Sequence, residues 1–581
     1  MSIFEILTLL GGLAIFLFGM QVMGDGLERR GGGKLKSILE SMTSNKFKGV
    51  LLGLGVTAII QSSSATTVMV VGFVNSGIMR LSQAISVIMG ANIGTTVTAW
   101  LLSLSGIEGD NTIIQLLKPS SFSPVLAVIG IVFMMFLKNP KKKDTGAILV
   151  GFAVLMTGMD MMSGAVAGLK HNESFTSILT LFTNPFFGVL AGALLTAIIQ
   201  SSSASVGILQ ALSSTGQITF GSAIPIIMGQ NIGTCITAIL SAIGANKNAK
   251  RVSVVHLSFN IIGTICFMVL FYVLHWILDF GFINDSVNAA SIAVLHSIFN
   301  IFATVIMFPF TKGLEKLSMM IIRDNDKKEQ ESVLDERLLS TPPVAIVQAK
   351  NVADKMAFIA KDSLIRAMEL IGNYDEKEAE LVREDESRVD EYEDILGTYL
   401  VKLSRESLSQ DDSHEISNLL HCIGDFERIS DHAVNIVESA EEIAEKKIVF
   451  SPEAQRELEV VKAALTEILE NTFKAFETEN LELAMKIEPL EQIIDTLKTK
   501  LRANHITRLQ ADNCTIETGF VFSDLLTNIE RAADHCSNIG VCLISVAHDS
   551  FDTHEYLHHV KEGGESNFNE VYALYKEKYS I

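Results

Sequence analysis

The first 323 residues consist of long apolar runs separated by short polar segments, whereas the rest of the chain contains no such run. Apolar runs of about 16–24 residues, when helical, match a hydrocarbon layer ~30 Å thick. The first run has no basic segment before it and no small-residue cleavage motif after it, so we expect it to be retained as a span. The predicted spans are 4–24, 82–104, 122–138, 145–168, 219–243, 252–277 and 287–310.

Two further apolar stretches, 49–78 and 188–216, are each interrupted in the middle by Gln-Ser-Ser-Ser. They belong to an internal repeat with a constant offset of 139 residues. GVLLGLGVTAIIQSSSA (49–65) aligns with GVLAGALLTAIIQSSSA (188–204), and IMGANIGTTVTA (88–99) aligns with IMGQNIGTCITA (227–238). A gapless match of this kind indicates duplication. We predict one repeat at about 5–138, a second at about 145–277, and an extra span at 287–310.

Charge decides how the two interrupted stretches cross the membrane. If each enters and leaves on the same side, sixteen Lys and Arg residues of the apolar region lie on one side, and two, Lys118 and Lys170, lie on the other. The basic side of a membrane protein is normally cytoplasmic. We therefore predict re-entrant hairpins in a cell (inner) membrane, an outside N-terminus and a cytoplasmic C-terminal region. Three crossings separate the repeats, so they are predicted to be inverted, as in many transporters.

The serines at the tip of each predicted hairpin suit an anion bound beside a cation. The half-helix after the break presents free N–H groups and the positive end of its dipole. A serine caps such a helix and its hydroxyl can also donate a hydrogen bond. The preceding half-helix ends in free carbonyl groups, which are ligands for a hard cation. Close packing of small residues is the alternative explanation for one serine, but the duplicated motif favours a binding site.

A second polar element, Asn-Ile-Gly-Thr, interrupts the span that follows each hairpin. Glycine permits local unwinding, and Asn and Thr carry side-chain oxygens. We expect these spans to bend beside the hairpin tips and to contribute ligands.

The duplicated Gln-Ser-Ser-Ser, followed about thirty residues later by Asn-Ile-Gly-Thr, resembles the bacterial type of the type II sodium-dependent phosphate cotransporter family over residues 5–310. The resemblance implies that the motifs bind phosphate and sodium. The residues to which it assigns this binding are Gln61, Ser62, Ser63, Ser64, Thr66, Asn92, Thr95, Gln200, Ser201, Ser202, Ser203, Ser205, Asn231 and Thr234.

Three other polar residues of the membrane region are considered for a functional role. VHLSFN (255–260) resembles a His-x-x-Phe-Asn motif of the same family, and LHSIFN (295–300) is a looser copy. In that family such a motif follows each half, whereas here both copies follow the second repeat. We therefore favour a packing role for His256 and His296, with hydrogen bonds that support the hairpins. Asp160, whose counterpart is Gln21, is either a cation ligand or proton site, or a helix-end residue that faces water.

Beyond residue 323 the chain is acidic, because this part holds 54 of the 66 Asp and Glu residues but only 27 of the 46 Lys and Arg residues. We predict a polar linker at 324–345, a helical domain at 346–560 and a tail at 561–581. DFERISDHAVNIVE (425–438) aligns with NIERAADHCSNIGV (528–541) at an offset of 103. The region resembles PhoU, which implies two linked three-helix bundles.

The acidic repeat contains paired carboxylates one helical turn apart. They either bind a cation between helices or form a surface network. The PhoU resemblance implies a divalent ion or an iron cluster as the bound metal. The candidate ligands are Asp385, Glu427, Asp431, Glu488, Glu530 and Asp534.

Together these patterns predict an all-α chain: a polytopic membrane domain with inverted repeats and re-entrant hairpins, followed by a cytoplasmic PhoU-like bundle. We expect a Na⁺-coupled inorganic phosphate symporter that works by alternating access and is regulated by the bundle. Transport of another oxyanion, coupling to protons, or phosphate sensing without net transport remain alternatives. No nucleotide-binding loop or nucleophile–base pair points to an enzyme, and the acidity argues against nucleic acid as a partner. A homo-oligomer or a cytoplasmic regulatory partner is left open.

Overall fold

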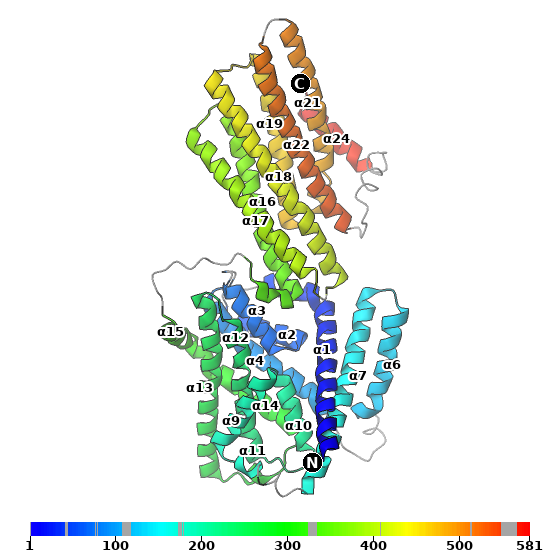
Figure 1. Ribbon diagram of the computed structural model, residues 1–581, viewed down its shortest axis with the longest axis vertical. Helices are drawn as coiled ribbons and strands as arrows, with labels where there is room; N and C mark the ends of the chain where they lie inside the picture. Colours follow the sequence, from blue (N-terminus) through cyan, green and yellow to red (C-terminus); the bar gives the residue numbers. More distant parts are fainter. Residues whose placement is uncertain are drawn as a thin grey trace. The chain divides into compact units, whose positions relative to one another are not determined.

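The computed structural model describes residues 2–40, 45–75, 77, 79–106, 118–171, 177, 179–323, 334–406, 408–511, 514–547 and 566–581. These residues form helices, with one isolated β-bridge between Thr219 and Ser286. They divide into two compact units, Met1–Ala345 with Ser407–Ser409, and Ile346–Glu406 with Gln410–Ile581. Figure 1 labels the helices of both units. The expected all-α fold is confirmed.

The first unit contains the apolar helices. They are α1 (Ile3–Glu40), α2 (Lys46–Ile60), α3 (Ser63–Asn75), α4 (Leu81–Ser103), α6 (Pro119–Phe136), α7 (Pro140–Val166), α9 (Pro185–Ile199), α10 (Ser202–Ser213), α11 (Phe220–Gly233), α12 (Cys235–Ser241), α13 (Lys247–Leu278), α14 (Ala289–Met307) and α15 (Thr311–Ile321).

Six segments of the described chain are long and apolar enough to cross a membrane. They are Ile3–Arg30, Leu81–Gly106, Pro140–Leu169, Phe220–Ser241, Lys247–Leu278 and Ala289–Ile321. The seventh predicted span, 122–138, corresponds to α6, whose apolar part, Ser121–Phe136, belongs with the shorter helices. The two Gln-Ser-Ser-Ser stretches each form a pair of short helices rather than one long span.

Helices α1 and α7 occupy equivalent places in the two repeats and pack directly against each other (Figure 1). A methyl group at Gly19 would lie 2.3 Å from Leu155 N, and one at the equivalent Gly158 would lie 2.4 Å from the equivalent Phe16 N. A second set of positions exchanges contacts in the same way, Gly12 with Met162 and Gly151 with Met23. Reciprocal contacts of this kind define a two-fold axis. The contacts run antiparallel, as inverted repeats require.

Glycines also bring helices together within each repeat. A methyl group at Gly53 in α2 would lie 1.9 Å from the Val87 carbonyl oxygen in α4, and one at Gly192 in α9 would lie 2.1 Å from the Ile226 carbonyl oxygen in α11. No side chain fits at either crossing, so the backbones touch and small residues set the helix separation. These crossings place each hairpin against the helix that carries Asn-Ile-Gly-Thr.

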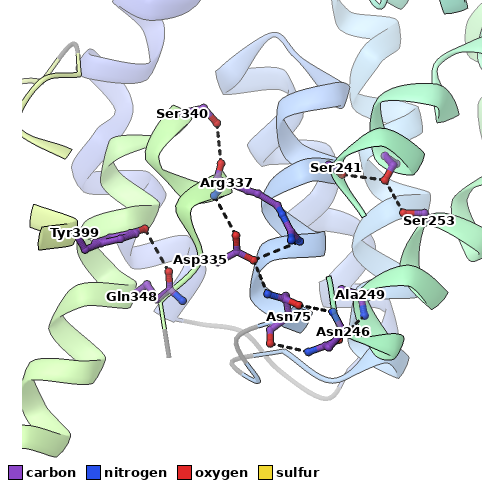
Figure 2. Close-up of polar contacts among 11 residues, drawn as sticks. Asn75, Ser241, Asn246, Ala249, Ser253, Asp335, Arg337, Ser340, Gln348 and Tyr399 are labelled. Atoms are coloured by element: carbon purple, nitrogen blue, oxygen red, sulfur yellow. Dashed lines mark hydrogen bonds and ion pairs between the residues drawn. The ribbon is translucent and has the colours of Figure 1, made fainter. Parts of the chain in front are cut away.

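The residues predicted as a linker are only partly described, because 324–333 lie outside the described residues. The described part includes a short 3₁₀ helix, η5 (Glu336–Ser340), which packs against α3. Asp335 is 4% exposed and accepts a hydrogen bond of 2.9 Å from Asn75 Nδ2 at the end of α3 (Figure 2). The Leu338 side chain lies over Gly72. This segment is therefore part of the first unit, contrary to its polar sequence pattern.

The second unit is a bundle of long helices (Figure 1). They are α16 (Pro342–Leu370), α17 (Glu376–Leu403), α18 (Gln410–Lys446), α19 (Pro452–Thr478), α20 (Leu481–Ala484), α21 (Ile487–Gln510), α22 (Ile516–Ala547) and α24 (Ser566–Lys578). The helix α24 belongs to the predicted tail, and it packs on α21. The residues 548–565 lie outside the described part of the chain.

The second unit has reciprocal contacts of its own across the offset of 103 residues. His432 Nδ1 on α18 lies 3.0 Å from Asn528 Oδ1, and His535 Nδ1 on α22 lies 2.8 Å from Asp425 Oδ1. The two histidine rings are 5.6 Å apart between centroids. Equivalent residues thus meet at the crossing of α18 and α22, which joins the two three-helix repeats.

Candidate functional site

Each Gln-Ser-Ser-Ser motif is a break between two short helices. Gln61 ends α2 and Gln200 ends α9, and both have φ of 59°, a left-handed conformation that is uncommon outside glycine. The N–H group of each glutamine donates to the carbonyl of the threonine four residues earlier, Thr57 or Thr196. The chain therefore turns at the same residue in both repeats, which agrees with the predicted hairpin tips.

The serine after each glutamine starts the next helix. Ser62 Oγ accepts a hydrogen bond of 3.1 Å from Ala65 N, and Ser201 Oγ accepts one of 3.2 Å from Ala204 N. These are N-cap contacts, which explain why the sequence has serine at this position. The N-terminal ends of α3 and α10, with their dipoles, consequently lie at the two tips.

The two tips meet. Ser63 Oγ and Ser202 Oγ are 3.5 Å apart, and both residues are buried. The two positions are equivalent under the offset of 139, so the contact lies on the two-fold axis of the first unit. The residues around it in both hairpins are uncharged, because neither 49–78 nor 188–216 contains Asp, Glu, Lys or Arg. The site is thus a neutral junction of two helix N-terminal ends.

Behind the tips the two hairpins differ. In the first, Thr57 Oγ1 donates to Thr66 Oγ1 at 3.0 Å. In the second, the equivalent hydroxyls of Thr196 and Ser205 are buried and have no hydrogen-bond partner within the described chain. Unpaired buried hydroxyls are costly unless a ligand or water uses them. Thr57 and Thr196 were missed as candidates from the sequence, although the repeat retains a threonine at both positions.

The glutamines also differ between the hairpins. Gln61 is 7% exposed, and its Oε1 accepts a hydrogen bond of 3.0 Å from Thr98 Oγ1 on α4. Gln200 is exposed. The first tip is therefore anchored to the neighbouring helix through its glutamine. Thr98 was not singled out from the sequence, and its position three residues after Asn-Ile-Gly-Thr was the available signal.

The Asn-Ile-Gly-Thr elements are buried, and their amides bond within their own helices. Asn92 Nδ2 donates to the Ile88 carbonyl and Asn231 Nδ2 to the Ile227 carbonyl, both at 2.9 Å, while Asn231 Oδ1 also lies 3.4 Å from His296 Nε2. The bend predicted here occurs in one repeat only. The second span divides at Thr234, between α11 and α12, whereas α4 continues through Asn92.

The remaining membrane candidates take secondary positions. His296 Nε2 lies 3.4 Å from Asn231 Oδ1, and the His256 carbonyl accepts from Cys235 Sγ at 3.6 Å, directly after the second Asn-Ile-Gly-Thr element, so both histidine motifs lie against it. This agrees with a supporting role for them. Asp160 and its counterpart Gln21 are both exposed on the first unit.

The paired carboxylates of the second unit do not form a metal site in the described part of the chain, where no group of three or more His, Cys, Asp or Glu side chains is placed to hold a metal ion. Asp385 instead forms ion pairs with Arg366 and Arg388. Glu530 pairs with Lys498 at 2.7 Å.

The two Glu-x-x-x-Asp pairs hold like charges close together. Burial is the main cause that raises the pKa of Glu427, and the nearby Asp431 carboxylate raises it further. Burial is likewise the main cause that raises the pKa of Asp534, and the Glu530 carboxylate raises it further. Glu488 accepts a hydrogen bond from Ser537. With Asp385 held by two guanidinium groups, the six residues do not fit a metal cluster, and we assign no step to one.

Comparison with known proteins supports both halves of this description. The Na⁺/Pi-cotransporter family model matches residues 15–164 and 166–291, and the PhoU domain model matches 353–440 and 460–542. The chain is 24% identical over 539 residues to YjbB of Salmonella typhimurium, for which inorganic phosphate export is the candidate activity; the match covers 90% of this chain and 95% of the relative.

Two further relatives match a smaller share of the chain. The uncharacterized protein YqeW of Bacillus subtilis is 30% identical over 254 residues, which is 43% of this chain and 78% of the relative. The sodium-dependent phosphate transport protein 2A of Rattus norvegicus is 23% identical over 384 residues, which is 45% of this chain and 60% of the relative. This chain is therefore a membrane protein of the Na⁺/Pi-cotransporter family, a phosphate transporter family, and it carries a C-terminal PhoU domain.

Proposed function

We propose that this protein is a Na⁺-coupled phosphate symporter whose substrate site is the junction of the two hairpin tips. The observation that carries the proposal is the Ser63–Ser202 contact on the two-fold axis. Two helix N-terminal ends and their serine hydroxyls converge there on one point, and helix N-terminal ends favour oxyanions. Inverted-repeat transporters bind substrate at the repeat interface, where discontinuous helices meet.

The lack of charge at the junction supports coupling to a cation. A doubly charged phosphate placed among neutral donors needs compensating positive charge, which bound Na⁺ would supply. The carbonyl ends of α2 and α9 and the hydroxyls of Thr196 and Ser205 offer oxygen ligands, the type that hard cations prefer. The phosphate/sodium ligands proposed here are the fourteen residues assigned from the sequence, extended by Thr57 and Thr196.

The symmetry supports a mechanism of alternating access. Two inverted repeats that pack through reciprocal contacts can exchange conformations, so that each repeat adopts the arrangement of the other. The site then opens to one side and afterwards to the other, without moving far from the axis. The charge distribution supports an arrangement in the inner membrane with the N-terminus outside and the acidic domain on the cytoplasmic side.

The PhoU domain is proposed to regulate transport through η5. Asn75 ends α3, the second helix of the first hairpin, and it binds both Asp335 and the N-cap residue of α13: Asn75 Oδ1 accepts from Asn246 N at 2.8 Å, and the Asn75 carbonyl accepts from Asn246 Nδ2 at 2.7 Å (Figure 2). The chain continues from η5 directly into α16. A shift of η5 would therefore pull on the end of the hairpin.

Reconstitution in proteoliposomes tests the proposal. Inward gradients of Na⁺, K⁺ or H⁺ are imposed separately, with labelled phosphate outside in one set and inside in another, so that coupling ion and direction are read independently. Accumulation of phosphate against its gradient with Na⁺ alone is the expected result. Accumulation driven by protons would overturn sodium coupling. Phosphate binding without accumulation under any gradient would instead indicate a sensor.

A further inference from the structure

A cavity with a basic rim lies away from the hairpin tips, at the N-terminal ends of α2 and α4. Its volume is about 200 Å³. The residues that line it are Asn45, Lys46, Gly49, Leu52, Met79, Arg80, Ser82, Gln83, Ser86 and Val87. The set contains two cations and no carboxylate.

Two helices begin at this cavity. Helix α2 starts at Lys46 after the N-cap Asn45, and α4 starts at Leu81 after Arg80 in the N-cap position. Lys46 Nζ donates to the neutral Thr311 Oγ1 at 2.5 Å, and Arg80 Nε contacts Gln83 Oε1 at 3.5 Å. Neither cation forms an ion pair with a described carboxylate. The positive charges and the positive dipole ends of two helices therefore add at one place.

A buried hydroxyl in the cavity wall lacks a partner. Ser86 is 1% exposed, and its Oγ has no hydrogen-bond partner among the described residues. A serine within a helix normally bonds back to the carbonyl one turn earlier, so an unpaired, buried Oγ points to a group that is supplied from outside the chain. This hydroxyl is independent of the charge argument.

The second repeat shows that the fold does not require these two cations or this hydroxyl. At the equivalent positions it has Pro185, Thr219 and Pro225 in place of Lys46, Arg80 and Ser86. The packing is otherwise retained, because a methyl group at Gly188 would lie 2.8 Å from Pro225 Cβ, as one at Gly49 would lie 2.8 Å from Ser86 Cβ. Both cations and the hydroxyl thus occur in the first repeat alone, which indicates a function specific to one side of the protein.

We propose that this cavity binds a phosphate group, with Lys46 and Arg80 as charged donors and Ser86 as a neutral donor. Arginine and lysine beside helix N-terminal ends are a frequent arrangement for phosphate oxygens. The ligand is either free inorganic phosphate or the phosphate of an anionic lipid headgroup. Because the pocket lies at the far ends of α2 and α4 from the tips, it is distinct from the transport site and would report ligand on the basic side of the protein.

Local thiol protection in the full-length protein tests the proposal. Ser82 is exposed and lines the cavity, so Ser82→Cys places a reporter thiol there, and its labelling rate is followed by mass spectrometry of the peptide that contains it. One arm adds inorganic phosphate to protein in detergent, with chloride at equal ionic strength as the comparison. The other arm compares nanodiscs of phosphatidylglycerol with nanodiscs of phosphatidylcholine.

Protection by phosphate over chloride identifies free phosphate, and protection by phosphatidylglycerol over phosphatidylcholine identifies a lipid headgroup; either result supports the site. Adding Lys46→Gln and Arg80→Gln should weaken the protection about tenfold or more, since each change removes a charge-assisted contact. Ser86→Ala should weaken it less. The exposed pair Lys48→Gln and Lys143→Gln carries the same charge change outside the cavity and should leave protection intact.

Equal labelling rates in all conditions, or protection that survives Lys46→Gln with Arg80→Gln, would overturn the proposal. The result is separable from the transport site. Ser63→Ala with Ser202→Ala in the Ser82→Cys background should reduce uptake by about tenfold or more but keep the protection, if both proposals hold. If instead those serine changes leave uptake normal while protection persists, the symporter site is wrong and the cavity stands.

Discussion

Both units of this chain arose by duplication, and in each unit a pair of equivalent side chains meets where the two repeats join. In the membrane unit the pair is Ser63 and Ser202, and in the PhoU unit it is His432 and His535. The first junction is neutral and flanked by helix N-terminal ends. The second is titratable, and its neighbours differ, since His535 faces Asp425 while His432 faces Asn528.

The comparison teaches that duplication supplies a symmetric frame, while single substitutions beside the axis give each junction its chemistry. In the membrane unit the two residues on the two-fold axis are both serines, and the repeats differ further from the axis, at Thr196 and Ser205 and at the Lys46 cavity. In the PhoU unit the residues that differ between the repeats, Asp425 and Asn528, contact the two histidines directly. The proposed transport site would work in two conformations related by the two-fold axis, so its centre should favour neither, whereas the proposed regulatory contact has no such requirement.

The largest effect is expected where helices touch through glycine. Gly53→Ala and Gly192→Ala should each abolish folded yield or uptake, because a Cβ would meet a backbone oxygen at 1.9 and 2.1 Å, and neither backbone can withdraw without separating the helices. Gly55→Ala, on the same helix as Gly53 with nothing within 4 Å, is the matched control and should be neutral or slightly stabilising. Yield and phosphate uptake are the measurements. If only one of the two variants lost yield or uptake, the two helix crossings would not be equivalent, which would contradict the symmetric packing of the repeats.

The next effect concerns the serines on the membrane axis. Ser63→Ala and Ser202→Ala should each reduce phosphate uptake by about tenfold or more, since each removes one donor from a neutral site. Because the two hydroxyls are in contact, the double variant should lose less than the product of the single losses. Ser214→Ala, at the far end of the second hairpin, is the control. Strictly additive losses, or normal uptake in both single variants, would contradict a shared site.

An intermediate effect is expected at η5. Asp335→Ala leaves the Asn75 amide and the Arg337 N–H without their shared acceptor, at a cost of about 1–3 kcal/mol. Uptake should persist but lose its dependence on internal phosphate, because η5 no longer holds the end of α3. Ser340→Ala, an exposed change in the same short helix, should keep that dependence. Regulation that is unchanged in Asp335→Ala would remove η5 as the connection.

The smallest effect concerns pH at the PhoU axis. Burial lowers the pKa of His432, which the Asn528 contact only partly opposes. The folded form therefore binds fewer protons than the unfolded form below about pH 6.5, so stability is complete above that pH and declines as pH falls through it. Asn528→Asp gives His432 a carboxylate like that of His535, favours its charged form and should reverse the decline.

Hydrogen exchange of α18 and α22 between pH 8 and pH 5.5 measures this effect, and the corresponding difference in Tm should be about 2 °C or less. Gln510→Glu, an equal charge change at an exposed position at the end of α21, serves as the control for net charge. If hydrogen-exchange protection fell equally between pH 8 and pH 5.5 in Asn528→Asp and in the parent chain, protonation of His432 would not be the cause of the lost stability.

Several features could be predicted from the sequence because they are written in local patterns. The hairpin breaks follow from Gln-Ser-Ser-Ser within apolar runs, since serine caps a helix and the flanking halves are too short to cross a membrane. The glycines that pair α1 with α7 were visible as matched repeat positions. Other features needed tertiary contacts. The predicted polar linker, 324–345, contains Asp335 and Leu338, and both are buried against α3.

The candidate metal ligands show the same limit from the other direction. Spacing along a helix correctly grouped Glu427 with Asp431, but it could not reveal that Asp385 is paired with Arg366, nineteen residues earlier. Likewise, the orphaned hydroxyls of Thr196 and Ser205 follow from the absence of a nearby acceptor in three dimensions. A sequence shows which groups can bind, but only the packing shows which of them are already occupied.

By itself the sequence determined the two duplications, the helical content, the short half-helices and the family, because these depend on hydrophobic period, capping residues and motif spacing. The tertiary structure alone decided that Ser63 meets Ser202, that His432 meets His535 across unlike partners, and that Lys46, Arg80 and Ser86 share one cavity. Those contacts join residues far apart in the chain, so they depend on how the helices pack, and at the Lys46 cavity glycines let α2 and α4 approach closely.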